Sequence, residues 1–265
     1  MLYDLPLPVL LVAMVVLLGG ATALGNWTGR RAARADGLGF RSLNIEATLA
    51  GAGLGLLALM LGFTFSMALT RYEARRTAVL EEANAIGTAW LRAGLLPTPE
   101  RAQSRRLLAD YARVRLALRS PRMAVAAAGI GRSVALQDRL WALAERASRA
   151  AIAGAPDTSG PMVGLYIAAL NEVIDAHERR LSSLRTHVPD AVMWVLIMVA
   201  GMVLGYGGHL AGKEGSRLRL AGVVMAVMVA CVIVLIMDLD RPERGLVQVS
   251  RQPLVDVVQG LSPPR

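Results

Sequence analysis

Four stretches of the chain are apolar and free of charged side chains over about the width of a lipid bilayer. A helix rises about 1.5 Å per residue and the hydrocarbon core is about 30 Å thick, so about 20 apolar residues suffice to cross it. We therefore predict an all-α membrane protein with four transmembrane helices. The stretches are Leu5–Gly29, Ala47–Thr70, Ala191–Gly212 and Leu220–Met237.

The first apolar stretch has an alternative interpretation as a secretory signal peptide, because Ala21-Thr22-Ala23 has the small residues of a cleavage site. Residues 1–8, however, contain Asp4 and no Lys or Arg, whereas a secretory signal begins with a basic region. The apolar run is also longer than the hydrophobic region of a signal. We expect this segment to be the first membrane span.

Residues 71–189 form the only sizeable polar region, and their pattern predicts a helical bundle outside the membrane. Neither Gly nor Pro interrupts the pattern between the second span and Gly87, which predicts one long helix leaving the membrane. This helix is expected to end at Leu95-Leu96-Pro97, and a second helix is expected to begin with Thr98 as its N-cap. Breaks are expected at Ser120-Pro121 and Gly129–Gly131, before a third helix that starts at about Ser133. A loop at Pro156–Pro161 is expected to precede a fourth helix.

The predicted organisation has four parts. Residues 5–70 hold the first two spans and a basic loop, residues 71–189 the helical bundle, and residues 190–238 the last two spans. Residues 239–265 are expected to form a turn and an extended tail, because Leu246–Ser250 alternates between apolar and polar positions as a short strand or extended arm does.

Charge adds one feature to this picture. The net charge of +9 comes almost entirely from arginine, since Lys213 is the only lysine. The basic residues lie on helices beside membrane spans, where anionic lipid headgroups are the expected contact. No nucleic-acid-binding motif is present, so we expect no nucleic-acid partner. The single cysteine, Cys231, lies in the fourth span and is expected to be a small packing residue.

Catalytic and metal-binding patterns are missing from the sequence. The histidines His177, His187 and His209 are scattered, whereas a metal site needs converging ligands. Asp175, His177 and Glu178 lie on a helix with two neighbouring arginines, which is typical of a solvated, ion-paired face. We therefore predict no enzymatic activity, no metal and no cofactor.

One segment approaches a nucleotide-binding motif. Gly207–Lys213 fits GxxxxGK, but a phosphate-binding loop then needs Ser or Thr and a preceding strand. Here Glu214 follows and a predicted membrane helix precedes. We interpret the segment as a tight turn between the third and fourth spans.

The second span carries the most informative pattern. Gly51 and Gly55 form a GxxxG pair that permits close helix packing, and Gly201 and Gly205 repeat it in the third span. Leu59, Phe63 and Met67 recur at four-residue spacing, with Thr70 near the same stripe. In a homo-oligomer with this helix at its centre, the stripe would form a hydrophobic constriction of the kind that gates a pore by dewetting. The alternative is that these residues pack against lipid or core.

Three sequence runs resemble the bacterial bestrophin-like membrane proteins. They are Leu61–Pro97, which contains EEANAIGTA, Asp238–Gly245, which contains DLDRP, and Val249–Leu254. The resemblance covers residues 47–254 and implies a pentameric anion channel with four spans and an attached helical domain. It also implies that the second span lines the pore, with Leu59, Phe63 and Met67 at the spacing of the bestrophin neck. The acidic calcium-binding cluster of animal bestrophins has no counterpart here, so calcium gating is not expected.

Two functions from different classes therefore remain open. The first is a homo-oligomeric ion channel of the bacterial inner membrane, a pentamer by resemblance, whose partners are small ions and membrane lipids. The second is a non-conducting scaffold or sensor whose helical bundle binds a protein or a lipid.

Orientation is left open by two conflicting arguments. The loops at residues 26–46 and 213–219 are rich in arginine, so the positive-inside rule places them in the cytoplasm. The resemblance to bestrophins instead places the helical domain there.

Two groups of polar residues are candidates for structural or ion-vestibule roles. Glu81, Glu82 and Asn84 lie on the helix that leaves the second span, and we predict structural, interfacial roles for them rather than catalytic ones. Glu81 and Glu82 are expected to pair with arginines of adjacent helices or subunits. The second group has two alternative roles: its side chains either fix the chain where it leaves the fourth span or line an ion vestibule. This second group is Asp238, Asp240 and Arg241.

Overall fold

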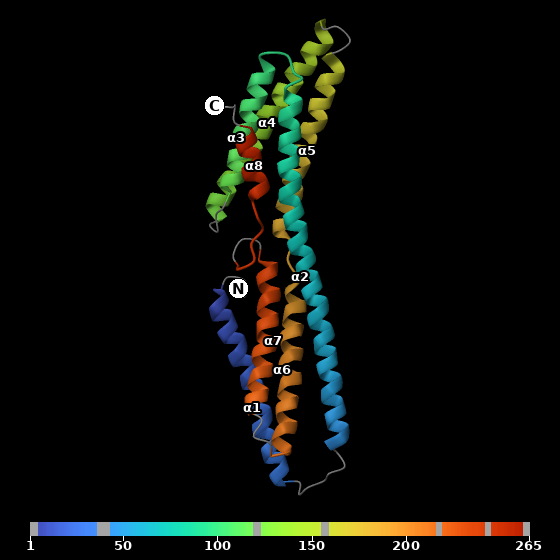
Figure 1. The fold of residues 1–265 in the computed structure, drawn as a ribbon, viewed down its shortest axis with the longest axis vertical. Helices are drawn as coiled ribbons and strands as arrows, with labels where there is room; N and C mark the ends of the chain where they lie inside the picture. The colour runs from blue at the N-terminus through green and yellow to red at the C-terminus, as the bar shows by residue number, and fades with distance from the viewer. Residues whose placement is uncertain are drawn as a thin grey trace. The chain divides into compact units, whose positions relative to one another are not determined.

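The computed structural model describes residues 5–35, 43–118, 123–154, 159–215, 219–241 and 245–261. These residues form eight helices and no strand, which confirms the all-α prediction (Figure 1). The helices are α1 (Leu7–Ala35), α2 (Leu43–Ala93), α3 (Glu100–Ala117), α4 (Met123–Gly154), α5 (Ser159–Arg185), α6 (Asp190–Lys213), α7 (Arg219–Asp240) and α8 (Gln252–Gly260).

Four helical stretches are long and apolar enough to cross a membrane: Leu7–Arg34, Ile45–Ala93, Gly160–Lys213 and Leu220–Asp240. Each contains or overlaps one of the four predicted spans. The second of them belongs to α2, a single helix of 51 residues. The prediction that the second span continues into the polar region without a break is therefore confirmed.

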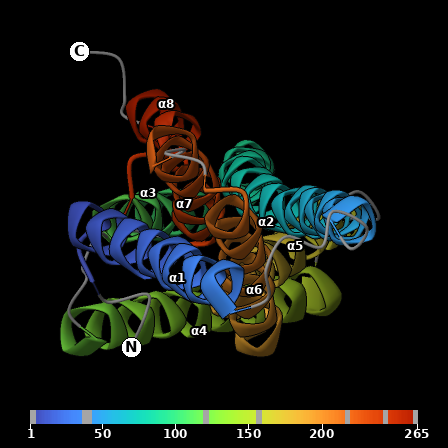
Figure 2. The ribbon, with the colours of Figure 1, turned by 90° about the horizontal axis from the view of Figure 1, so that it is seen from below.

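The chain divides into two compact units, and each is described by itself. Unit 1 comprises Met1–Tyr72, His187–Arg241 and Gly245–Val247. In it α1 packs against α6 and α7, which also pack against each other (Figures 1 and 2). The buried core of unit 1 is aliphatic, and its members include Leu10, Leu18, Leu57, Leu196 and Ile233.

The contact between α1 and α6 is made by glycines. At four positions, a side-chain carbon added to the glycine would lie only 1.8–2.3 Å from a backbone oxygen of the other helix. No other residue leaves room for backbones this close, a packing mode common between membrane helices. The glycines, each followed by the residue whose oxygen faces it, are Gly25 and Gly205, Gly29 and His209, Gly208 and Thr22, and Gly212 and Asn26.

Of the four glycines named from sequence, Gly205 alone takes part in this contact between the described residues, through its backbone oxygen, which faces Gly25. A carbon added at Gly51, Gly55 or Gly201 would meet no atom of the described chain within 4 Å. At Gly205 it would lie 3.4 Å from the oxygen of Ala21, an ordinary contact. Close packing of α2 through Gly51 and Gly55 is thus not seen among the described residues of one chain.

Unit 2 comprises Glu73–Thr186, Pro242–Arg244 and Gln248–Arg265. Within it α3 packs against α4 and α8, and α4 packs against α5. The core mixes alanines with larger side chains, so the helices approach closely around a few bulky residues. Fully buried members include Ile86, Leu108, Tyr111, Leu140 and Leu170.

Helix boundaries differ from the sequence expectations at the starts of α3 and α4. The N-cap of α3 is Pro99 rather than Thr98, and no side chain caps that end. Helix α4 begins at Met123, so Gly129 and Gly131 lie inside it instead of breaking it. A carbon added at Gly129 would lie 2.2 Å from a methyl of Leu118, so this glycine makes room for a neighbouring side chain.

Two further expectations are wrong because glycine does not end a helix at the first position and proline begins one at the second. Gly207–Lys213 is the last part of α6, not a turn, and the chain turns only after Lys213. Instead of an extended tail, Gln252–Gly260 forms α8 with proline in its first turn, where proline is tolerated. Leu246–Ser250 lies in bends and irregular structure rather than in a strand. Of the remaining expectations, the break at Ser120-Pro121 and most of the loop after Gly154 lie outside the described residues.

Candidate functional site

The stripe of large apolar residues on α2 is uncovered in the single chain. Phe63 is 67% exposed, Leu59 56% and Met67 38%. Thr70 is also exposed, and its hydroxyl donates to the backbone oxygen of Ser66 at 2.9 Å. The four predicted constriction residues therefore lie on one accessible side of the helix.

The other side of the same stretch of α2 is buried in unit 1. Leu57, Thr64 and Ala68 are each less than 4% exposed, and the Thr64 hydroxyl donates to the oxygen of Met60 at 2.7 Å. Phe65 is partly buried and packs against the same core. Both faces of this stretch are mainly apolar, but only one of them is buried. The exposed apolar ridge at Phe63 is therefore expected to contact lipid or other subunits of an oligomer.

At the end of α7, two carboxylates bind backbone N–H groups. Asp238 is 2% exposed and accepts hydrogen bonds from the N–H groups of Leu246 at 3.1 Å and Val247 at 3.0 Å. Gly245 lies against it, because a carbon added there would be 2.2 Å from the carboxylate. The carboxylate of Asp238 thus fixes the chain as it leaves α7.

Asp240 has the same kind of contact with another segment. It is 1% exposed, and both its oxygens lie 3.1 Å from the N–H of Val188, just before α6. Arg241 is buried as well, and its backbone N–H donates to the oxygen of Asp238 at 3.1 Å. These contacts support the structural role of the group over an ion vestibule.

Replacement of Asp240 by Asn separates the two roles. Loss of the charge weakens the bond to Val188, and a bond to a charged group contributes about 1.5–3 kcal/mol. We expect a lower yield of folded, monodisperse protein from Asp240→Asn in size-exclusion chromatography. Asp190→Asn, at an exposed carboxylate of the same unit, is the control and should behave like the parent. Normal assembly of Asp240→Asn with changed ion selectivity would instead support the vestibule.

Glu82, on α2, lies at the centre of a buried polar cluster in unit 2. Its side chain is fully buried and forms ion pairs with the guanidinium groups of Arg115 on α3 and Arg180 on α5. The hydroxyl of Tyr111 donates to Glu82 at 3.4 Å and accepts a bond from Gln137 on α4 at 3.2 Å. One carboxylate thereby connects the four long helices of this unit.

Histidine 177 joins the cluster, contrary to the sequence expectation. Its Nδ1 lies 3.3 Å from the hydroxyl of Tyr111, and its side chain is 0% exposed. Asp175 and Glu178 are exposed as expected, but His177 does not share their solvated face. The spacing of His177 from the buried residues Leu170 and Val173 follows the helical period, and this signal was available in the sequence.

Burial shifts the pKa values of two members of this cluster, His177 and Tyr111. Burial, with the nearby Arg115 guanidinium, lowers the pKa of His177, and burial beside Glu82 raises the pKa of Tyr111. Both side chains are therefore neutral at pH 7. An unfolded histidine has a pKa of about 6.5. The contribution of His177 to stability is therefore complete above that pH and decreases as the pH falls below it, towards the lowered pKa of the folded state.

The neighbours of Glu82 have less enclosed positions. Glu81 is exposed and pairs with Arg179 at 3.2 Å, and Arg179 also contacts Glu172. Asn84 is exposed as well. No group of three or more His, Cys, Asp or Glu side chains that could hold a metal ion occurs in the described parts of the chain.

Comparison with known proteins places these features in a family. The protein-family model named Bestrophin-like domain matches residues 10–254 of this sequence. No curated protein matches the sequence. Among solved structures, a bacterial bestrophin homologue from Klebsiella pneumoniae has 14% identity and a TM-score of 0.67, over 95% of this chain and 96% of that one. A structure described as a membrane protein matches with 14% identity and a TM-score of 0.67, over 96% and 97% of the two chains. With four apolar spans, a continuous α2 and this shared fold, the chain belongs to the bestrophin-like domain family.

Proposed function

We propose that the protein is a homo-oligomeric anion channel in which α2 lines an axial pore. The observation that carries this proposal is the uncovered apolar ridge of α2, since Leu59, Phe63 and Met67 are exposed while the opposite face is buried. A central pore gives such a ridge a place away from water and lipid. The resemblance to bestrophins, which are anion channels, supports this arrangement and suggests a pentamer in the bacterial inner membrane.

The ridge would act as the constriction of the pore. Successive residues at four-residue spacing differ in direction by only about 40°, so Leu59, Phe63 and Met67 can all face one axis, with Thr70 beyond them. A ring of large apolar side chains excludes water and raises the barrier to an ion.

Truncation of Phe63 tests the proposal. Because Phe63→Ala widens and wets the narrowest ring, we expect chloride efflux from liposomes to rise several-fold over the parent while the oligomer keeps its size. The matched control is Phe65→Ala, which removes the same side chain two residues away, where it packs on the core of unit 1. That variant should lose stability without gaining flux.

Two other outcomes would contradict the proposal. Background flux in the parent and in Phe63→Ala, with intact oligomers, would mean that the ridge only packs and that the protein is a non-conducting scaffold or sensor. Equal flux increases in Phe63→Ala and Phe65→Ala would indicate a general loosening of the helices rather than a pore constriction. If Phe63→Ala alone increases flux, the reversal potential in a chloride gradient shows whether the permeant ion is an anion.

A further inference from the structure

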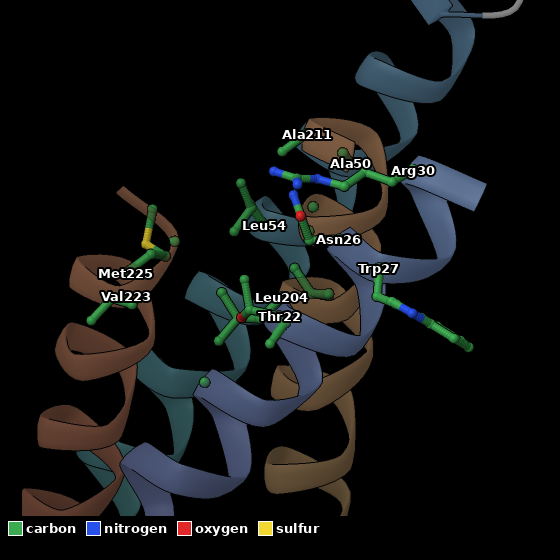
Figure 3. A pocket seen from close by; sticks show the side chains of 16 residues that line it. Thr22, Asn26, Trp27, Arg30, Ala50, Leu54, Leu204, Ala211, Val223 and Met225 are labelled. Atoms are coloured by element: carbon green, nitrogen blue, oxygen red, sulfur yellow. The ribbon is translucent and has the colours of Figure 1, made fainter. Parts of the chain in front are cut away.

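Unit 1 contains a cavity of about 580 Å³ between α1, α2, α6 and α7 (Figure 3). Its volume lies in the range of small-molecule sites. The residues around it are mainly apolar side chains and glycines, all belonging to membrane-spanning helices. The larger apolar members are Leu54, Val203, Leu204, Val223 and Met225.

One cation reaches this apolar space. Figure 3 shows the Arg30 side chain extending from α1 towards Ala211 of α6, above Asn26, at one end of the cavity. The Nε atom of Arg30 is buried and has no hydrogen-bond partner among the described residues. A buried donor without an acceptor costs about 1–3 kcal/mol, so this group calls for an acceptor from outside the chain.

The surroundings of Arg30 are those of a membrane interface. The guanidinium of Arg31 lies 3.8 Å from the ring centre of Trp27, and Arg34 is exposed one turn further along α1. Tryptophan and arginine are typical of the level of the lipid headgroups. Glu46, a nearby acid, is held by Lys213 at 2.8 and 3.0 Å.

We propose that this cavity binds an anionic phospholipid, with its phosphate on Arg30 and an acyl chain along the apolar lining. The planar guanidinium group matches phosphate geometry, and basic pockets between membrane helices bind anionic headgroups. The apolar lining favours a lipid over free phosphate, because a free anion would leave the greater part of the cavity unfilled. The site does not depend on whether the protein conducts ions.

Two glycines make the acyl part of the site testable. Gly19 and Gly207 line the cavity, and a carbon added at either one would meet no described atom within 4 Å. The first carbon of a side chain at position 207 would therefore enter open space at the cavity, and we expect a leucine there to occupy part of it. Gly207→Leu removes room for the acyl chain, whereas Arg30→Gln removes the phosphate contact.

The experiment compares retained lipid in the full-length protein by native mass spectrometry, after incubation with equal amounts of phosphatidylglycerol and phosphatidylcholine. We expect the parent to retain phosphatidylglycerol preferentially, and Arg30→Gln to lose that preference by about tenfold, the factor for about 1.4 kcal/mol. Arg34→Gln, which removes an exposed charge from the same end of α1, should keep it. Arg30→Lys keeps the charge but not the planar fork, and should retain part of the preference. Gly207→Leu should lose both lipids.

Each other outcome overturns the proposal. Equal losses in Arg30→Gln and Arg34→Gln would indicate general attraction of anionic lipid to a basic surface. Displacement of phosphatidylglycerol by inorganic phosphate would show a free-anion site. Retained lipid in Gly207→Leu would mean that the acyl chain binds outside this cavity. A changed oligomer size in that variant would mean that a neighbouring subunit, rather than a lipid, fills the cavity. Thermal unfolding of each variant shows that lost binding is not lost folding.

Discussion

Replacement of Glu82 by Ala is expected to destabilise the protein by about 3–5 kcal/mol, because it leaves the buried guanidinium groups of Arg115 and Arg180 without their shared carboxylate. For a protein of this size, that corresponds to a fall of about 10 °C in the unfolding temperature. The measurement is thermal unfolding of the full-length protein in detergent, followed by the loss of monodispersity.

The adjacent residue gives a matched control for Glu82. Glu81→Ala removes the same side chain one position away, where the ion pair with Arg179 is exposed on both sides. An exposed pair contributes about 0.2–1 kcal/mol, so the control should unfold within about 3 °C of the parent. If both variants shifted the unfolding temperature equally, the buried cluster would not be a major contributor to the stability of unit 2.

The second large effect is expected at the contact of α1 with α6. A methyl group at Gly208 would lie 2.2 Å from the oxygen of Thr22, so Gly208→Ala must push two backbones apart. Overpacking in a core costs about 1–3 kcal/mol when side chains can adjust, and here a backbone oxygen cannot. We expect a loss above that range, seen as little folded protein in detergent extracts.

Gly201 offers the matched control on the same helix. A methyl there meets no described atom within 4 Å, so Gly201→Ala should be neutral or slightly stabilising through its better helix propensity. The comparison separates steric conflict from a general intolerance of α6 to alanine. Equal yields of folded Gly208→Ala and Gly201→Ala protein would contradict the close approach of the two helices.

The features predicted correctly are those that depend on one helix at a time. Length and apolarity alone decide whether a segment can span the membrane, and these are local properties of the sequence. The extension of α2 through Ala93 likewise follows from the lack of a helix breaker before Gly87. The exposed ridge at Phe63 lies where the four-residue spacing indicated, although its role as a constriction remains a prediction.

The features missed depend on what a residue meets in another helix. Gly129 and Gly207–Lys213 lie inside helices, although glycine on its own favours a break in the sequence pattern. A glycine costs about 1 kcal/mol in a helix, and close packing, as at Gly208 and Gly212, can offset that cost. The charged sequence neighbours of His177 favour a solvated position, but its helical face is the buried one. The cavity beside Arg30 was not predictable, since it depends on side chains of four separate helices.

The glycine contacts also determine which motions are accessible to unit 1. Each facing oxygen occupies the gap left by a missing side chain, so sliding α1 along α6 by one residue, about 1.5 Å, would move these oxygens out of their gaps and against neighbouring backbone atoms. The glycine contacts therefore resist sliding of α1 along α6. Helix α2 has no such interlock, since a carbon added at Gly53 meets only the Val203 side chain at 3.4 Å. In the proposed channel, tilting of α2 would therefore disturb fewer close backbone contacts than sliding of α1 along α6.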